Sequence, residues 1–350
     1  MRLQHMQEET IILAIEIGGT KCEILAVNPL TGDVVGSVRH QADELPPECR
    51  PKQFFGGIGR TEEMRRFCLA ELFGTVKPRN VLLATNVVLD GMKGMLEEHG
   101  IAIQDSLYVG EIEGAFLSMD MTWGIAMASG TGTVGMVWMP DGSSRLIDGV
   151  GPMLGDWGSG YSIGLDFLRR AFREQESQNE PLEEMQRICA HLDCFPGTER
   201  KADERPLFEN YRRLARFVYE NSDRSVIASL SRVCGDCAKR GSVMATEVLV
   251  KAGDDLAESV IRASRRSGMD AIQGFPMLAS GSVLLKNDIV FDAMKKRLET
   301  ELPQAKVIRA ARPQVCGQVV GMLHKLHPVE SKAVINHFFE SYQKWINNKH

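Results

Sequence analysis

The stretch Ile15-Glu16-Ile17-Gly18-Gly19-Thr20-Lys21 ends an apolar run over residues 11–17 and leads into a second apolar run over residues 22–27. Glycine lets a backbone approach a polyanion and turn its N–H groups toward it, and the hydroxyl of Thr20 adds a donor. The pattern of strand, glycine loop and strand is therefore typical of a phosphate-binding loop. Its candidate phosphate ligands are Gly18, Gly19, Thr20 and Lys21.

The same order returns roughly a hundred residues later, where Ser129-Gly130-Thr131-Gly132-Thr133 separates the apolar runs 124–128 and 134–138. A third glycine-rich run, residues 149–164, contains Gly155-Asp156-Trp157-Gly158-Ser159-Gly160. One such loop is weak evidence, but two strand-flanked loops predict two lobes that face one phosphate chain. The candidate ligands in the second loop are Gly130, Thr131, Gly132 and Thr133.

The length and net charge of the chain limit its domain number and the kinds of partner it can bind. The chain has 350 residues, enough for two domains, and its 43% apolar and 25% charged residues are ordinary for a soluble globular protein. A net charge of −5 offers no basic field to attract nucleic acid or an anionic membrane. Small anions must therefore be bound by local loops, and we expect neither nucleic acid nor membrane as a partner.

The N-terminal residues and the cysteines favour a cytoplasmic location. The first ten residues are polar, so no secretory signal is expected, and no run approaches the ~20 apolar residues of a membrane span. Eight scattered cysteines do not resemble a disulfide framework, and reduced thiols are the simpler interpretation. Cys234 and Cys237 form a CxxC pair in a helix-like stretch, but a zinc site needs about four ligands, so we expect no metal there.

The first half of the chain alternates between predicted strands and helices. The expected strands cover residues 11–17, 22–27, 33–38, 81–84 and 107–109, the expected helices cover 62–73 and 111–119, and residues 42–60 are expected to be irregular. Residues 124–128, 134–138 and 144–147 then repeat the N-terminal order of strand, glycine loop, strand, turn and strand. This repetition favours an internal duplication of one three-stranded unit.

The rest of the chain is predicted mostly helical. Residues 162–268 are expected to be helical apart from connections, followed by a strand at 275–279 and helices at about 288–302 and 331–345. From these elements we predict an N-terminal lobe over residues 1–120, a C-terminal lobe over 121–325 and a C-terminal helix over 326–350.

The three loops resemble those of the actin-like ATPase fold that sugar kinases, actin and Hsp70 chaperones share. Within that fold they are most similar to the BadF-type ATPase family, which includes N-acetylglucosamine kinase. The run 151–164, GPMLGDWGSGYSIG, is the most specific match, since the family run is close to GxxxGDEGSGYWIG. Residues 15–21 and 128–133 resemble the family's two phosphate loops, residues 278–282 its adenosine-side loop, and residues 313–321 the start of its C-terminal helix.

The likeness covers roughly residues 10–325 and implies an α/β class protein with a two-lobed actin-like ATPase (ribonuclease H-like) fold, each lobe a mixed sheet flanked by helices. The ROK family of sugar kinases is a competitor, because LAIEIGGTK would suit it equally well. Its cysteine-rich zinc motif, C-x-C-G-x-x-G-C, is absent here, and the GDWGSG run has no place in it.

The sequence also departs from the family pattern. The acid at the end of the first strand is normally Asp and here is Glu16, and the catalytic Asp of an N-D-A tripeptide is matched by Glu111 in Gly110-Glu111-Ile112. The family's Glu in GDEGSG is Trp157, and a Gly/Ser-rich sugar-side segment is replaced by Thr85-Asn86-Val87-Val88. The phosphate frame is kept while the sugar-facing positions differ, which leaves the substrate and the catalysis open.

The resemblance implies a role for each candidate residue. Glu16 is the candidate Mg²⁺ ligand, through water, and Glu111 the candidate catalytic base, with Glu113 as a fallback. Each has a plain structural alternative: a solvated strand-end carboxylate for Glu16, and for Glu111 a helix-start carboxylate favoured by the dipole. The candidate substrate ligands are Asp156, Trp157 and Gly158, and the adenosine-side candidates are Gly281 and Ser282. Asp156 could equally be a turn-capping or cation-side residue, and Trp157 a packing residue.

The function implied is an ATP-dependent kinase that transfers the γ-phosphate to a hydroxyl of an amino sugar or hexose, with N-acetylglucosamine as the first guess and ATP and Mg²⁺ as cofactors. A non-catalytic nucleotide or sugar sensor on the same fold is the alternative. An electron-transfer activator with an iron–sulfur cluster is a third possibility that the cysteine positions do not favour. A homodimer through the C-terminal lobe is also expected.

Overall fold

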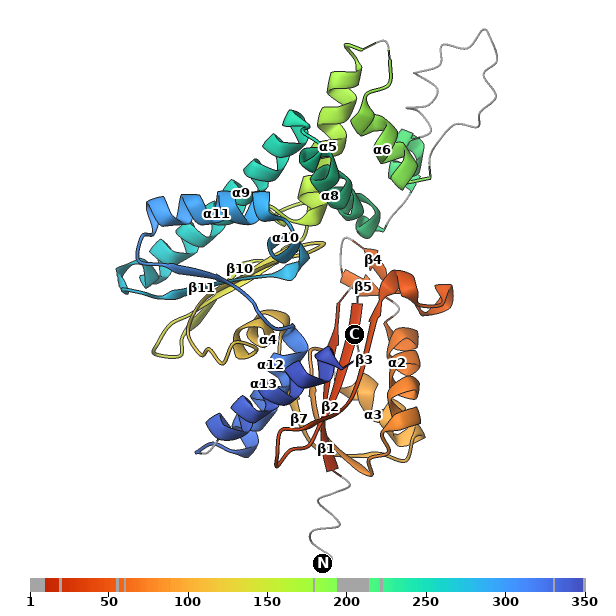
Figure 1. Ribbon diagram of the computed structural model, residues 1–350, viewed down its shortest axis with the longest axis vertical. Helices are drawn as coiled ribbons and strands as arrows, with labels where there is room; N and C mark the ends of the chain where they lie inside the picture. The colour runs from red at the N-terminus through yellow and green to blue at the C-terminus, as the bar shows by residue number, and fades with distance from the viewer. Residues whose placement is uncertain are drawn as a thin grey trace, which may run out of the picture. The chain divides into compact units, whose positions relative to one another are not determined.

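The computed structural model of the chain describes residues 10–18, 21–54, 57–59, 61–87, 89–178, 180–193, 214–220, 223–329 and 331–348. Its contacts divide the chain into two compact units, each with its own five-stranded sheet (Figure 1). The first unit comprises Met1–Lys52, Ile58–Thr122 and Ala310–His350, and the second comprises Gln53–Gly57 and Trp123–Arg309.

The sheet of the first unit has the strand order β3-β2-β1-β6-β7. Strands β1 and β2 pair antiparallel, as do β2 and β3, whereas β6 runs parallel to β1 and β7 parallel to β6. The strands are β1 (Thr10–Ile17), β2 (Lys21–Val27), β3 (Val34–Gln41), β6 (Asn80–Thr85) and β7 (Ala102–Tyr108). Strand β1 is buried almost throughout, which explains its unbroken apolar sequence, because both faces of a central strand are covered.

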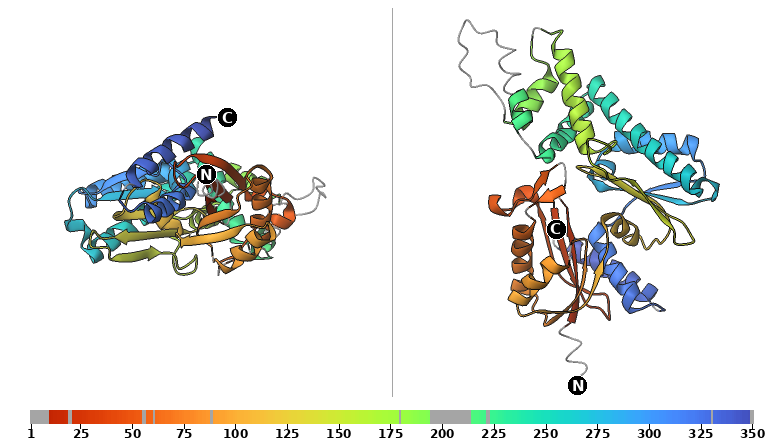
Figure 2. Two further views of the ribbon diagram at one scale, coloured as in Figure 1. Left: turned by 90° about the horizontal axis from the view of Figure 1, so that it is seen from below. Right: turned by 180° about the vertical axis from the view of Figure 1, so that it is seen from behind.

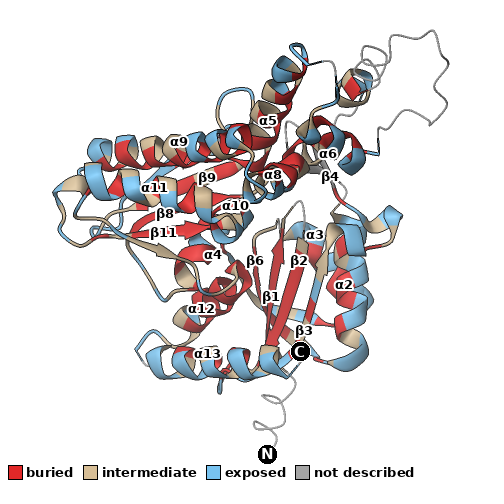
Figure 3. Ribbon diagram, turned by 45° about the horizontal axis from the view of Figure 1, so that its top comes forward, coloured by how far each residue is buried: buried red, intermediate tan, exposed pale blue. Residues whose placement is uncertain are grey.

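Helices cover both faces of this first sheet (Figure 1). One face packs against α2 (Glu62–Thr75) and α3 (Asp90–Glu98), and the other against α12 (Gln314–Leu326) and α13 (Ser331–Asn347). Helix α4 (Glu111–Leu117) follows β7 and packs on α12. The burial colouring shows β1 and much of α12 as buried (Figure 3). The first unit is therefore a three-layered body with two apolar cores.

The sheet of the second unit has the order β10-β9-β8-β11-β12, with the first two pairings antiparallel and the last two parallel. The strands are β8 (Gly124–Ser129), β9 (Thr133–Trp138), β10 (Ser144–Asp148), β11 (Pro276–Ser280) and β12 (Lys306–Arg309). The order and sense of the strands are those of the first sheet. This agreement is what the predicted duplication of a three-stranded unit requires.

A long helical insertion lies between β10 and β11. It contains α5 (Gly160–Gln175), α6 (Glu183–His191), a helical segment over residues 214–220, α8 (Arg224–Lys239) and α9 (Val243–Ser267), and α10 (Gly281–Lys286) and α11 (Asp288–Glu301) follow β11. Seen from behind, α9 and α11 lie side by side along one face of the sheet (Figure 2). These helices and that face form one continuous core.

Several boundaries differ from the sequence predictions. Residues 310–325, which we expected in the C-terminal lobe, group with the first unit, because α12 packs on β1, β6 and α4. Residues 42–60 are not wholly irregular: they contain the 3₁₀ turns Ala42–Glu44 and Pro47–Cys49 and the short pair β4 (Lys52–Phe54) and β5 (Gly57–Gly59). Helix α3 and strand β12 were not predicted. Within the described residues, no helix is both long and apolar enough to cross a bilayer.

Candidate functional site

The first glycine loop begins where β1 ends. The Gly18 N–H donates to the Lys21 carbonyl at 2.9 Å, which closes a tight turn between β1 and β2. The side-chain amide of Asn86 fastens the same point, because its oxygen accepts from the Ile17 N–H at 3.0 Å and its nitrogen donates to the Ile17 carbonyl at 2.9 Å. Gly19 and Thr20 lie outside the described residues. Asn86, which the sequence marked only as a departure, therefore holds the start of the loop.

Three charged side chains meet at this end of β1 and β2. Glu16 and Glu23 are direct partners across the antiparallel pair, and both are buried, at 2% and 3% exposure. The Lys21 ammonium lies 2.8 Å from Glu16 Oε2 and also contacts Glu23 Oε2. Arg39 on β3 approaches the other oxygen of Glu23, with Nε 3.1 Å from Oε1. Glu23 and Arg39 were not recognised from the sequence; their signal is the shared face of neighbouring strands.

Burial and charge pull the pKa values of this group in opposite directions. Burial raises the pKa of Glu16 to about 7, although Lys21 lowers it, and the nearby carboxylates of Glu23 and Glu111 raise it further. Burial also lowers the pKa of Lys21, but Glu16 and Glu23 more than offset that effect and hold it above its ordinary value. The lysine therefore stays charged, whereas Glu16 exchanges a proton near neutral pH.

Glu111 is the first residue of α4 and keeps a solvent-exposed side chain. Its carboxyl hydrogen-bonds the side chain of Gln314, the first residue of α12. The dense surroundings raise the pKa of Glu111, and the Gln314 hydrogen bond and the Lys21 charge oppose this rise. Glu113 has another task, because its carboxylate accepts from the Gly110 N–H at 3.4 Å in a capping arrangement. Both acids are exposed, but Glu113 is engaged in capping its own helix, which leaves Glu111 as the acid free of that task.

In the second unit, the loop Ser129–Thr133 is attached to the start of α5. The carbonyls of Gly130 and Thr131 accept from the Gly160 and Tyr161 N–H groups at 2.7 and 3.1 Å. The Ser129 hydroxyl donates to the Gly158 carbonyl at 2.8 Å. The structure therefore joins the loop Ser129–Thr133 to the GDWGSG run.

Asp156 is buried at 3% exposure and holds these two loops together. Its Oδ1 accepts from the Thr133 N–H at 2.9 Å, and its Oδ2 lies 3.4 Å from Arg224 Nη1 at the start of α8. Burial raises the pKa of Asp156, while the Thr133 N–H and Arg224 lower it. A Cβ on Gly132 would lie 2.8 Å from Asp156 Oδ1. Glycine at position 132 therefore lets the Asp156 carboxylate come close to the backbone of this loop. These contacts are those of a loop-capping carboxylate.

Asp148, at the end of β10, anchors the same run from the other side. Its two carboxylate oxygens accept from the Asp156 and Trp157 N–H groups at 2.9 and 3.1 Å. The Trp157 ring itself is 52% exposed, so it is available to a ligand. Gly158 has φ +67°, and a Cβ there would lie 2.5 Å from the Ala252 carbonyl oxygen. Both its backbone conformation and its packing against α9 therefore require glycine at this position. Asp148 was missed because it precedes the recognised motif.

Gly281 opens α10 at φ +82°, and a Cβ on it would lie 2.4 Å from the Ser129 carbonyl oxygen. Ser282 is next to it, with its hydroxyl 3.9 Å from the Cβ position of Gly130. The adenosine-side candidates therefore lie beside the second phosphate loop. The described candidates thus form two groups, Glu16, Gly18, Lys21 and Glu111 in the first unit, and Gly130–Thr133, Asp156–Gly158, Gly281 and Ser282 in the second.

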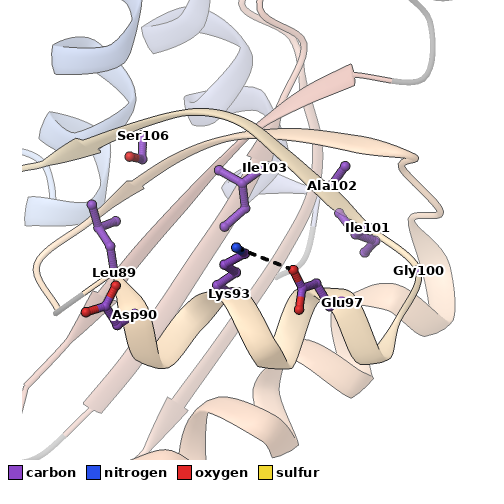
Figure 4. A pocket seen from close by; sticks show the side chains of 9 residues that line it. All are labelled: Leu89, Asp90, Lys93, Glu97, Gly100, Ile101, Ala102, Ile103 and Ser106. Atoms are coloured by element: carbon purple, nitrogen blue, oxygen red, sulfur yellow. Dashed lines mark ion pairs between the residues drawn. The ribbon is translucent and has the colours of Figure 1, made fainter.

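A cavity of about 560 Å³ lies between α3 and β7 of the first unit (Figure 4). Leu89, Ile101 and Ile103 give it apolar walls, and Lys93 and Glu97, which also line it, form an ion pair of 3.9 Å. None of the predicted site residues lines it. The cavity is therefore separate from the candidate site.

The described cysteines are free thiols, and Cys234 and Cys237 lie buried in α8. Burial raises the pKa of both, which keeps them protonated. Over the described ranges, no group of three or more His, Cys, Asp and Glu side chains is arranged to hold a metal ion. A metal at the first loop would thus rely on one or two carboxylates together with ligand oxygens and water, as Mg²⁺ commonly does.

Two sheets of one topology, each with a glycine loop after its first strand, define the α/β, two-lobed fold of the actin-like ATPases. Solved structures with the same fold include a protein from Chromobacterium violaceum provisionally named N-acetylglucosamine kinase, with TM-score 0.56, 17% identity, and coverage of 89% of this chain and 98% of that one. A protein from Porphyromonas gingivalis with the same provisional name matches at TM-score 0.54 and 15% identity, covering 90% and 99%. The predicted fold class is confirmed.

The chain belongs to the BadF/BadG/BcrA/BcrD ATPase family, whose profile matches residues 88–321. It is 24% identical over 188 residues to the N-acetyl-D-glucosamine kinase of Dictyostelium discoideum, a match covering 53% of this chain and 54% of that protein. It is also 24% identical over 198 residues to the N-acetylmuramic acid/N-acetylglucosamine kinase of Clostridium acetobutylicum, covering 56% and 60%. The matches thus span little more than half the length of these relatives. Family membership makes ATP the expected nucleotide, as the sequence predicted.

Proposed function

We propose that the protein is an ATP-dependent kinase that phosphorylates a hydroxyl of an amino sugar, with N-acetylglucosamine as the first candidate. The observation that carries the proposal is the group of Glu16, Lys21 and Glu111 beside the first glycine loop. It combines a cation for phosphate oxygens, a buried acid and an accessible acid with a raised pKa. Phosphoryl transfer needs these three kinds of group.

Glu111 would act as the general base. It would accept the proton of the sugar hydroxyl as that oxygen bonds to the γ-phosphorus and the bond to ADP breaks. A base works best when its pKa lies near the working pH, and the raised pKa of Glu111 moves it in that direction. The hydrogen bond with Gln314 would orient the carboxylate. Because Glu is longer than the family's Asp by one methylene, the acceptor oxygen must lie farther from the helix start.

Glu16 fits a Mg²⁺ site in chemistry and surroundings. Its Oε2 is buried, and its ion-pair partner within the described residues is the Lys21 ammonium, 2.8 Å away. The three carboxylates of Glu16, Glu23 and Glu111 lie near two cationic side chains, Lys21 and Arg39, which favours a further cation. Glu16 would hold Mg²⁺ there, and the ion would supply charge neutralisation for the phosphate groups. Lys21 would contact a phosphate oxygen directly.

In the second unit, Gly130, Thr131, Gly132 and Thr133 are proposed to bind phosphate, and Gly281 and Ser282 to lie against adenosine. The Thr133 hydroxyl supports this assignment, because its oxygen is buried and forms no hydrogen bond with the described residues. Of the predicted sugar contacts Asp156, Trp157 and Gly158, Trp157 is proposed to touch the sugar, and Asp156 and Gly158 to shape the loop that carries it. Trp157 would stack its exposed ring on an apolar sugar face. A homodimer and a cytoplasmic location stay predictions.

A non-catalytic nucleotide sensor is the second candidate. The ion pair of Glu16 with Lys21 favours it, because the acid expected to serve the metal already has a partner. A coupled assay of ADP release, run over N-acetylglucosamine, N-acetylmuramic acid, N-acetylmannosamine, glucosamine and glucose, separates the two. Turnover with one sugar supports the kinase. Nucleotide binding without turnover on any sugar supports the sensor.

A further inference from the structure

Glu16 and Glu23 face each other across β1 and β2, yet their surroundings differ. Like charges directly opposite in a sheet destabilise it unless a cation separates them. Lys21 supplies that cation. It lies two residues before Glu23 on β2, so the two side chains share a face of the sheet, and its ammonium reaches the carboxylates of both Glu16 and Glu23. The three side chains therefore form one buried unit.

The two carboxylates do not share the available cations equally. Glu23 has a cation at each oxygen, Lys21 at Oε2 and Arg39 at Oε1. Glu16 has Lys21 alone among the ion pairs of the described chain, with the ammonium 2.8 Å from its Oε2. Glu23 is thus the satisfied partner, and Glu16 is the one that retains capacity for a further cation.

Losing one member of a buried ion pair is costly, because the remaining charge is left uncompensated. If Glu16 were the only counter-ion of Lys21, a nucleotide-bound cation on Glu16 would leave the ammonium with no protein carboxylate to fix its position. Glu23 removes that conflict, since it contacts Lys21 independently of Glu16.

We propose that Glu23 is a positioning residue, the fixed counter-ion that holds Lys21 at the first glycine loop and so frees Glu16 for the cation of a bound nucleotide. The inference rests on the proposed nucleotide site. It assigns Glu23 no contact with the substrate: Glu23 acts through Lys21. Arg39 assists by occupying the second oxygen of Glu23, so that this carboxylate does not compete with Glu16 for the cation.

The proposal predicts a specific change in nucleotide binding. Glu23→Gln keeps the shape of the side chain and removes its charge, so Lys21 then depends on Glu16. We expect the gain in affinity that Mg²⁺ gives for the ATP analogue AMPPNP to fall at least about ten-fold, which corresponds to 1.4 kcal/mol. Affinity without Mg²⁺, measured in EDTA, stays close to wild type. Glu23→Asp restores part of the Mg²⁺ effect because it restores the charge.

Calorimetric titration of AMPPNP into full-length protein measures both affinities without turnover. Glu48→Gln, which removes one exposed carboxylate of the same unit, is the matched control and should behave as wild type. A Glu23→Gln protein with the wild-type Mg²⁺ effect would overturn the proposal, and so would equal weakening with and without Mg²⁺, which indicates a structural role only.

The two proposals fail in distinguishable ways. If the Mg²⁺ effect falls as expected but no sugar is phosphorylated, the kinase assignment fails and the role of Glu23 stands. If wild-type protein turns over sugar and Glu23→Gln keeps the full Mg²⁺ effect, the role of Glu23 fails alone. Absence of AMPPNP binding to wild-type protein would overturn both.

Discussion

Gly317 of α12 and Gly114 of α4 meet backbone to backbone: a Cβ placed on Gly317 would lie 1.8 Å from the Gly114 carbonyl oxygen. Only glycine allows two helices to approach this closely. Helix α4 starts with Glu111 and α12 starts with Gln314, whose side chains hydrogen-bond each other. The glycine contact therefore sets the position of the candidate base relative to the group that orients it.

Gly317→Ala should destabilise the protein and misplace Glu111. In an open helix position this change would stabilise by up to ~1 kcal/mol, but the clash here is with backbone, which cannot rotate away. We expect a net loss of about 1–3 kcal/mol in the free energy of unfolding and a loss of turnover larger than the change in nucleotide affinity. Thermal unfolding and steady-state kinetics measure the two effects.

The control for this substitution is Gly94→Ala in α3, because a Cβ there meets no atom within 4 Å. It should leave turnover unchanged and the melting temperature equal or higher. Equal melting temperatures for Gly317→Ala and wild type would contradict the close helix contact.

Asp148→Asn tests the anchor of the GDWGSG run. Asp148 has φ +55°, a conformation that Asn also tolerates, so the substitution changes mainly the hydrogen bonding. Of the Asp156 and Trp157 N–H groups, one loses its acceptor, because Asn has a single side-chain oxygen. The other keeps a hydrogen bond, but to a neutral oxygen instead of a carboxylate. We expect a loss of about 1–3 kcal/mol in stability and a raised KM for the sugar with less change in the KM for ATP. Equal effects on both KM values would argue against a sugar-side role for this run.

The pKa of Glu16 predicts a pH dependence of stability. Burial raises it from 4.5 to about 7, so between these pH values the folded chain binds a proton that the unfolded chain does not. The stabilisation is fully present below pH 4.5 and is lost as pH rises through about 7. Relative to Glu16→Gln, wild-type protein in EDTA should lose on the order of 2 kcal/mol between pH 5 and pH 8. Denaturant unfolding of both proteins measures this, and parallel pH profiles would contradict it.

The sequence predicted the sheets well because their strands are marked by apolar runs and glycine turns. Strands β1, β2, β8 and β9 lie within one or two residues of the predicted ranges. Helix α3 was missed because its sequence, DGMKGMLEE, contains two glycines that weaken helix propensity. The placement of α12 in the first unit depends on contacts more than 200 residues apart in the chain, which local patterns do not encode.

The candidate site was only partly predictable. The glycine loops carry a local signature, so the positions of Gly130–Thr133 and Asp156–Gly158 followed from the motifs. Glu23, Arg39 and Gln314 carry none, since they belong to the site only through strand register and helix packing. Asp148 lies just outside the recognised run, and its role depends on loop geometry.

The most direct test of the account compares wild-type protein with Glu111→Gln and Glu113→Gln in a single-turnover reaction with ATP, Mg²⁺ and the best sugar of the panel. Sugar phosphate is quantified by mass spectrometry, and nucleotide binding is measured in parallel. The account predicts that Glu111→Gln forms product about 10²–10⁴ times more slowly with nucleotide affinity unchanged, while Glu113→Gln stays near wild type. Product formed by Glu111→Gln at the wild-type rate would contradict the assignment of Glu111 as the base.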